Sequence, residues 1–107
     1  MNQLNVRELA DWLADTSREP PLVLDVREPW EIEKASLAGI TAIPMREIPA
    51  RAAELPRERE IVAVCHHGGR SMQVASFLSA HGFSEVANIA GGINAWSSEL
   101  DPAVPRY

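Results

Sequence analysis

The sequence predicts an α/β fold with a central, mostly parallel sheet covered by helices on both faces. Three observations support this prediction. Short runs rich in β-branched residues alternate with segments of helical periodicity along the chain. The run 22–26 is apolar on both faces, as in a buried parallel strand. The 107 residues suffice for one core and are too few for two. We therefore expect one domain over residues 1–107, with a core at about 4–100 and a proline-rich tail at 101–107.

The first predicted elements are a helix at about 6–15 and the strand 22–26. Asn5 has the residue type of a helix N-cap, and Glu8 follows three residues later, as in a capping box. Apolar residues then recur at helical spacing. Two prolines at 20–21 end this segment and lead into the strand.

Three shorter elements are predicted in the middle of the chain. A turn at 28–29 precedes a short helix over 30–35, and a brief strand over 41–43 ends at a proline. Pro49 suits the first turn of a helix over 48–55, whose apolar residues share one face.

The last third of the chain repeats the alternation of strand and helix. The strand 60–64 precedes a helix over 71–80, which Gly82 is well placed to end. A final strand over 85–89 is followed by a helix over 91–96, opened by two glycines.

Composition and charge exclude several classes of protein. The net charge of −5 argues against nucleic acid or an anionic membrane surface as a partner. No apolar run approaches the ~20 residues that span a bilayer, and the first residues show neither the basic nor the apolar part of a signal peptide. A lone cysteine excludes an internal disulfide and fits a reducing setting, so we expect a cytoplasmic protein.

The candidate site is that lone cysteine, Cys65, which lies between the strand 60–64 and the helix 71–80. The carboxyl end of a strand in an open α/β sheet is where ligands bind. The start of the helix and the cation of Arg70 favour a thiolate or a bound anion. Gly68 and Gly69 permit backbone conformations that turn several N–H groups toward one point. This pattern favours sulfur or oxyanion chemistry and does not choose between them.

Several separated motifs resemble the rhodanese family of sulfurtransferases. The run 65–71 has the pattern C-x-x-G-x-R-S of that family's active-site loop. The segment 24–31 resembles its early D-x-R motif, and 42–44 resembles its short middle strand. The segment 82–96 resembles its glycine-rich ending before a tryptophan. The resemblance implies a three-layer fold with about five mostly parallel strands and helices on both faces, and it implies no cofactor.

The resemblance also implies a mechanism. Cys65 would take the outer sulfur of a donor such as thiosulfate as a persulfide and pass it to cyanide, a thiol or a protein acceptor. The expected substrate-binding residues form the rest of the loop: His66, His67, Gly68, Gly69, Arg70 and Ser71. Asp25 and Arg27 would form a supporting shell, with Asp25 a candidate partner of Arg70.

Departures from the family and alternative functions stay open at this point. Ser36 stands where the family commonly has a histidine, and the loop carries only Arg70 and two histidines as cations, which leaves the match to thiosulfate open. A phosphatase or arsenate reductase would need C-x5-R, one residue more than the sequence has. A non-catalytic binding module of the same fold is the other alternative. No metal is expected, because adjacent residues such as Cys65, His66 and His67 rarely close on one ion.

Overall fold

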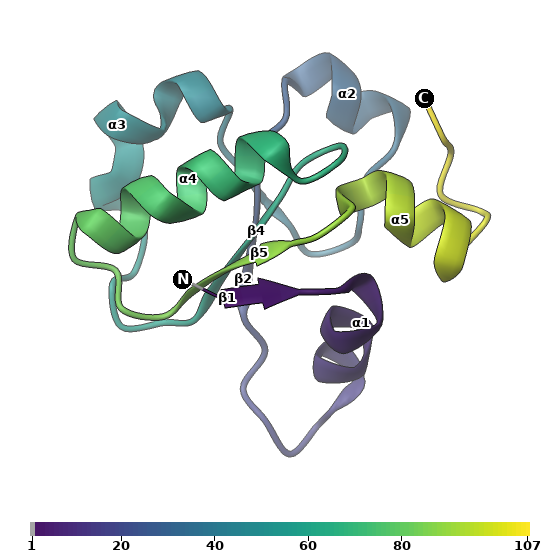
Figure 1. The fold of residues 1–107 in the computed structure, drawn as a ribbon, viewed down its shortest axis with the longest axis horizontal. Helices are drawn as coiled ribbons and strands as arrows, with labels where there is room; N and C mark the ends of the chain where they lie inside the picture. Colours follow the sequence, from purple (N-terminus) through teal and green to yellow (C-terminus); the bar gives the residue numbers. More distant parts are fainter. Residues whose placement is uncertain (1) are drawn as a thin grey trace.

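A computed structural model describes residues 2–107 and places a five-stranded sheet at the centre (Figure 1). The strands are β1 (Asn2–Leu4), β2 (Leu22–Asp25), β3 (Thr41–Ala42), β4 (Ile61–Val64) and β5 (Val86–Ile89). Their order across the sheet is β1-β5-β4-β2-β3, and every neighbouring pair is parallel. The predicted α/β fold with a mostly parallel sheet is confirmed.

Helices cover both faces of this sheet. They are α1 (Val6–Ala14), α2 (Pro29–Lys34), α3 (Ile48–Arg51), α4 (Gly69–Ala80) and α5 (Gly92–Glu99), with short 3-10 turns at Met45–Glu47 and Ala52–Glu54. One core cluster joins the sheet to α3 and α4, and a second joins it to α1 and α5. The result is the three-layer arrangement in Figure 1.

The alternation of side chains along β4 shows how the sheet builds both cores. Ile61 and Ala63 face the cluster under α4, whereas Val62 and Val64 face the cluster under α1 and α5. Cys65 continues this alternation beyond the last residue of the strand. It therefore lies on the α4 side, below the start of that helix.

Two features of the fold differ from the prediction. The strand β1 was not predicted, because it has only three residues, two of them polar, and lies at the edge of the sheet. The predicted helix over 48–55 is divided at Ala52 into α3 and a 3-10 turn.

The helix termini follow their sequence signals closely. Asn5 accepts the backbone N–H of Glu8 at 2.8 Å, and Glu8 accepts the N–H of Asn5 at 3.0 Å, so the predicted capping box is present. Gly82, just beyond α4, has a φ of +90°, which confirms it as the end of that helix. Within residues 2–107, no helix is long and apolar enough to cross a membrane.

Candidate active site

Cys65 lies in the loop between β4 and α4, at the carboxyl edge of the sheet. Its Sγ accepts the backbone N–H of Gly68 at 3.0 Å and is 3.3 Å from the hydroxyl of Ser71. Gly68 has a φ of +114°, which bends the chain back toward the sulfur so that α4 starts at Gly69 rather than at Ser71. The residue is only 1% exposed, so the sulfur lies at the base of the loop. A thiolate or persulfide here would receive the Gly68 N–H and the positive end of a twelve-residue helix. The Ser71 hydroxyl, which donates its hydrogen to Asn88 in this structure, lies close enough to turn toward a charged sulfur.

The start of α5 holds the other side of the same loop. The N–H of Ile93 donates to the carbonyl of Cys65 at 2.9 Å, and the N–H of Asn94 donates to the carbonyl of His66 at 3.0 Å. This approach requires a glycine at 92, because a Cβ there would overlap the Cys65 oxygen and lie 2.6 Å from the His66 oxygen. The paired glycines of the sequence thus let a second helix bind the loop through its backbone.

Buried polar side chains form a row of hydrogen bonds beneath α4, from Ser71 beside the sulfur to β1 at the edge of the sheet. The Ser71 hydroxyl is hydrogen-bonded to the side-chain oxygen of Asn88 on β5, and the Asn88 amide donates to Gln3 on β1 at 3.0 Å. Ser71 and Asn88 are almost fully buried. Asn88 was missed in the sequence because it is one polar residue inside an apolar strand.

Arg70 pairs with Glu31 of α2, and the expected pairing with Asp25 is wrong. Its two terminal nitrogens lie 2.6 and 2.7 Å from the two carboxylate oxygens of Glu31. Glu31 also accepts the N–H of Glu28 at 3.1 Å, which belongs to the capping box of α2. The hydrogen bonds from Arg70 are the main cause that lowers the pKa of Glu31 from 4.5 to about 2. Glu31 is therefore ionised at every pH at which the protein would work.

Asp25 is already used by its close neighbour Arg27, and both side chains are fully buried. The Arg27 guanidinium binds both Asp25 oxygens, with the shortest contact at 2.7 Å, and donates to the carbonyl of Ala35 at 2.7 Å. This pair ties β2 to the end of α2. The two residues thus lie beside the site, without a direct bond to Arg70.

Tyr107, the last residue of the tail, contacts residues of the site. No signal in the sequence indicated this contact. Its hydroxyl accepts from Arg27 at 2.9 Å and donates to Glu31 at 2.9 Å, so it bridges the two ion pairs. Its ring stacks on His66 with the centroids 4.0 Å apart and faces Trp30 edge-on at 6.3 Å. Figure 1 shows the carboxyl end beside α2.

The two loop histidines have different surroundings. His66 is half-buried between Tyr107 and His67, and burial lowers its pKa, which favours the neutral ring. The His67 side chain is exposed on the outer side of the loop. Neither histidine shares a metal-binding cluster, because no group of three such ligands occurs in the part of the chain that the structure describes.

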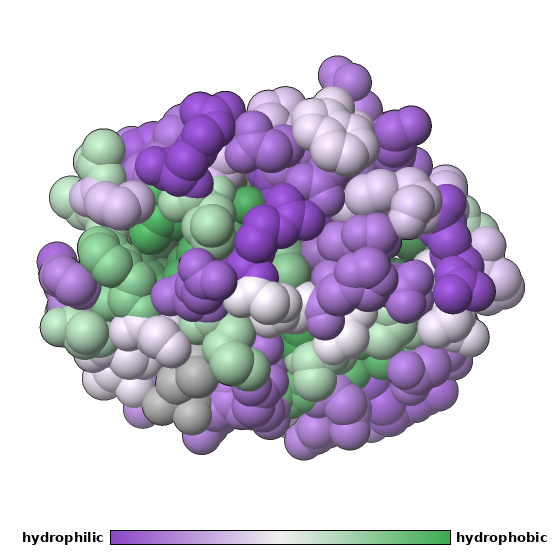
Figure 2. Space-filling model, turned by 45° about the horizontal axis from the view of Figure 1, so that its top comes forward, coloured by the Kyte–Doolittle hydropathy of each residue, from purple (hydrophilic) through white to green (hydrophobic). Residues whose placement is uncertain are grey.

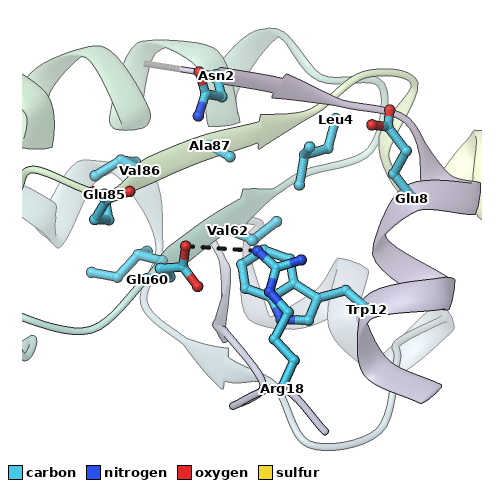
Figure 3. A pocket seen from close by; sticks show the side chains of 11 residues that line it. Asn2, Leu4, Glu8, Trp12, Arg18, Glu60, Val62, Glu85, Val86 and Ala87 are labelled. Carbon is cyan, nitrogen blue, oxygen red and sulfur yellow. Dashed lines mark ion pairs between the residues drawn. The ribbon is translucent and has the colours of Figure 1, made fainter. Parts of the chain in front are cut away.

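Two hollows of the surface lie away from Cys65. A cavity of about 160 Å³ lies between α1 and the starts of β4 and β5, where Arg18 stacks on Trp12 and pairs with Glu60 (Figure 3). This is the opposite end of the sheet from the loop. An apolar groove of about 210 Å³ separates α3 from α4, on the side where Figure 2 shows hydrophobic residues gathered. Neither hollow contains a residue of the predicted site.

Comparison with known proteins agrees with this geometry. The model of the Rhodanese-like domain family matches residues 7–99. A protein of Allochromatium vinosum named Sulfurtransferase is 36% identical over 104 residues, which are 97% of this chain and 95% of that protein. The chain therefore belongs to the rhodanese-like domain family, as its motifs predicted.

Two further relatives extend the comparison. The chloroplastic Rhodanese-like/PpiC domain-containing protein 12 of Arabidopsis thaliana is 40% identical over 112 residues. The match covers all of this chain but only 38% of that longer protein. The crystal structure of a rhodanese-related protein from Thermoplasma volcanium has a TM-score of 0.84 and 31% identity, with 94% of each chain covered.

Proposed function

We propose that the protein is a sulfurtransferase that carries sulfane sulfur as a persulfide on Cys65. The observation that carries this proposal is the position of Sγ, which accepts the Gly68 N–H and lies beside the Ser71 hydroxyl at the start of α4. These groups favour a negative sulfur, either the attacking thiolate or the persulfide. The relative named Sulfurtransferase supports the same chemistry.

The reaction has two displacement steps. In the first, the Cys65 thiolate attacks the outer sulfur of the donor, the donor's bond to that sulfur breaks, and the rest of the donor leaves with the electron pair. In the second, an acceptor such as cyanide or a thiol attacks the outer sulfur of the persulfide and restores the thiolate. The residues 66–71 would line the transferred sulfur. As the only cysteine, Cys65 must pass its sulfur to an acceptor outside this chain, which makes a small thiol or a protein thiol a suitable partner.

The loop length favours sulfur over phosphate. Only four residues separate Cys65 from Arg70, and Arg70 is held by Glu31 rather than free for a bound oxyanion. A phosphatase would need its arginine to bind the phosphate oxygens.

A turnover assay tests the proposal. The protein is incubated with a sulfane donor and cyanide, and the thiocyanate formed is measured. We expect turnover that Cys65→Ser abolishes, and no hydrolysis of an aryl phosphate. Hydrolysis of the aryl phosphate that is lost in Cys65→Ser would support a phosphatase. Absence of turnover with thiosulfate and with organic persulfides would support a binding module.

A further inference from the structure

The two arginines beside the loop are both neutralised by carboxylates. Arg27 is paired with Asp25, and Arg70 is paired with Glu31. A small dianion such as thiosulfate needs unpaired cations or many donors to offset the loss of its hydration. Neither arginine supplies an unpaired charge.

Arg70 and Glu31 form a bidentate ion pair in which the carboxylate is fully hydrogen-bonded. Glu31 is almost fully buried and accepts four hydrogen bonds: two from Arg70, one from Tyr107 and one from the N–H of Glu28. A dianion could recruit Arg70 only by breaking a bidentate pair and leaving a buried carboxylate without its counter-charge. Arg70 is therefore not available to a dianionic donor, although the loop sequence alone indicates a free cation there.

On the side of His66, the surroundings of the loop are aromatic. The His66 ring stacks on Tyr107, which in turn contacts Trp30 edge-on, and burial of His66 favours its neutral form. Trp30 is 56% exposed, so an apolar surface extends outward from the residue next to Cys65. Such a surface suits an organic group rather than an inorganic anion.

We propose that Glu31 determines donor specificity, by neutralising Arg70, so that Cys65 takes its sulfur from an organic persulfide in preference to thiosulfate. This inference rests on the proposed function. The Cys65 thiolate attacks the outer sulfur of R–S–SH, a new S–S bond forms to Sγ, and the bond to R–S breaks. The products are the Cys65 persulfide, which keeps the proton, and the thiolate RS⁻, which takes the electron pair.

The test compares two donors that differ in charge. 2-Hydroxyethyl persulfide has an uncharged carrier group, and thiosulfate is a dianion. The rate at which each donor adds one sulfur to the protein is followed by intact mass at pH 8 and low salt, where screening of charges is weak. We expect the wild type to react faster with the organic persulfide.

Two variants of the protein test whether Glu31 causes the preference for an organic persulfide over thiosulfate. Glu31→Gln frees Arg70, and we expect the rate with thiosulfate to rise about tenfold, with little change for the organic persulfide, since hydrogen bonds to a charged donor become available. Adding Arg70→Gln to this variant should return the thiosulfate rate to the wild-type level. Glu33→Gln is the matched control, because it removes an exposed carboxylate from the same helix and leaves Arg70 paired.

The outcomes separate this inference from the proposed function. Faster reaction of the wild type with thiosulfate would overturn the inference and leave sulfur transfer intact, and this comparison needs no variant to fold. An equal fall in both rates in folded Glu31→Gln would also overturn it, because Glu31 would then only support the loop. No reaction with either donor would overturn the proposed function itself.

Discussion

Cys65 combines burial with donors that suit an anion. Hydrophobic residues of the core surround it from below, while the Gly68 N–H donates to its sulfur and the Ser71 hydroxyl lies 3.3 Å from it. A buried cysteine in an apolar core alone would behave as a small hydrophobic residue. The N–H donor, the nearby hydroxyl and the helix start distinguish Cys65 from such a residue.

Ser71→Ala tests whether the Ser71 hydroxyl contributes to sulfur uptake. We expect sulfur uptake by Cys65 to slow by about tenfold. The hydroxyl can turn its hydrogen from Asn88 to a charged sulfur, a bond of roughly 1.5–3 kcal/mol, and loss of the bond to Asn88 offsets part of this gain. Single-turnover mass analysis measures the rate. Ser79→Ala, at an exposed position of the same helix, is the control and should keep the wild-type rate. An unchanged rate in Ser71→Ala would show that the hydroxyl takes no part.

Prediction from sequence was least successful for the partners of single residues. The loop and its cysteine were predicted from the spacing of the motif, but Arg70 was assigned to Asp25 rather than to Glu31. Asp25 ends β2 and Glu31 follows six residues later, and spacing cannot show that Arg27 already occupies Asp25. Tyr107 was missed for a similar reason, since its contacts lie 76 and 80 residues away along the chain.

At the scale of elements, two helix starts converge on one loop. The helix α4 directs its start at the sulfur, and α5 donates two backbone N–H groups to the carbonyls of Cys65 and His66. The loop is therefore held from both sides by backbone groups that no side-chain substitution removes directly. Its conformation depends on how closely α5 can approach.

Gly92→Ala should break this arrangement. The added Cβ overlaps the Cys65 carbonyl, and the φ of +55° is unfavourable for alanine, so we expect a cost of about 1–3 kcal/mol in unfolding free energy. Sulfur uptake should fall at least tenfold (about 1.4 kcal/mol in the barrier), because the loop must move. Chemical denaturation and the mass assay measure the two effects. In Gly39→Ala, which shares a positive φ of +75° but meets no atom within 4 Å, uptake should stay normal. Normal uptake in Gly92→Ala would contradict the role of α5.

Most elements were predictable because their signals are local. Caps, prolines and apolar periodicity predicted the helices and the strands β2, β3, β4 and β5 to within a few residues. The strand β1 depends instead on pairing with β5, which lies more than 80 residues away in sequence. Local signals cannot show such a pairing.

At the scale of the whole molecule, ion pairs join parts of the chain that are distant in sequence. Glu31 connects α2 to the start of α4, and hydrogen bonds from Tyr107 connect the tail to Glu31 and to Arg27 just beyond β2. Stability should therefore depend on the ionisation of Glu31.

Acid titration of stability tests this dependence. The pKa of Glu31 is lowered from 4.5 to about 2, chiefly by hydrogen bonds from Arg70. A lowered pKa in the folded state stabilises the protein above pH 4.5, and this contribution is lost as the pH falls toward 2. We expect the unfolding free energy of the wild type to fall by about 2 kcal/mol more than that of Glu31→Gln over this range. Urea denaturation at several pH values measures the difference, and Glu33→Gln should behave as the wild type. Parallel curves for the wild type and Glu31→Gln would contradict the account.

The mass of the protein after reaction with a sulfane donor tests sulfur transfer through Cys65 most directly. We expect one added sulfur atom, located on Cys65 by peptide mapping, removed by cyanide and absent from Cys65→Ser. An unchanged mass after exposure to both thiosulfate and an organic persulfide would contradict it, as would added sulfur that persists in Cys65→Ser.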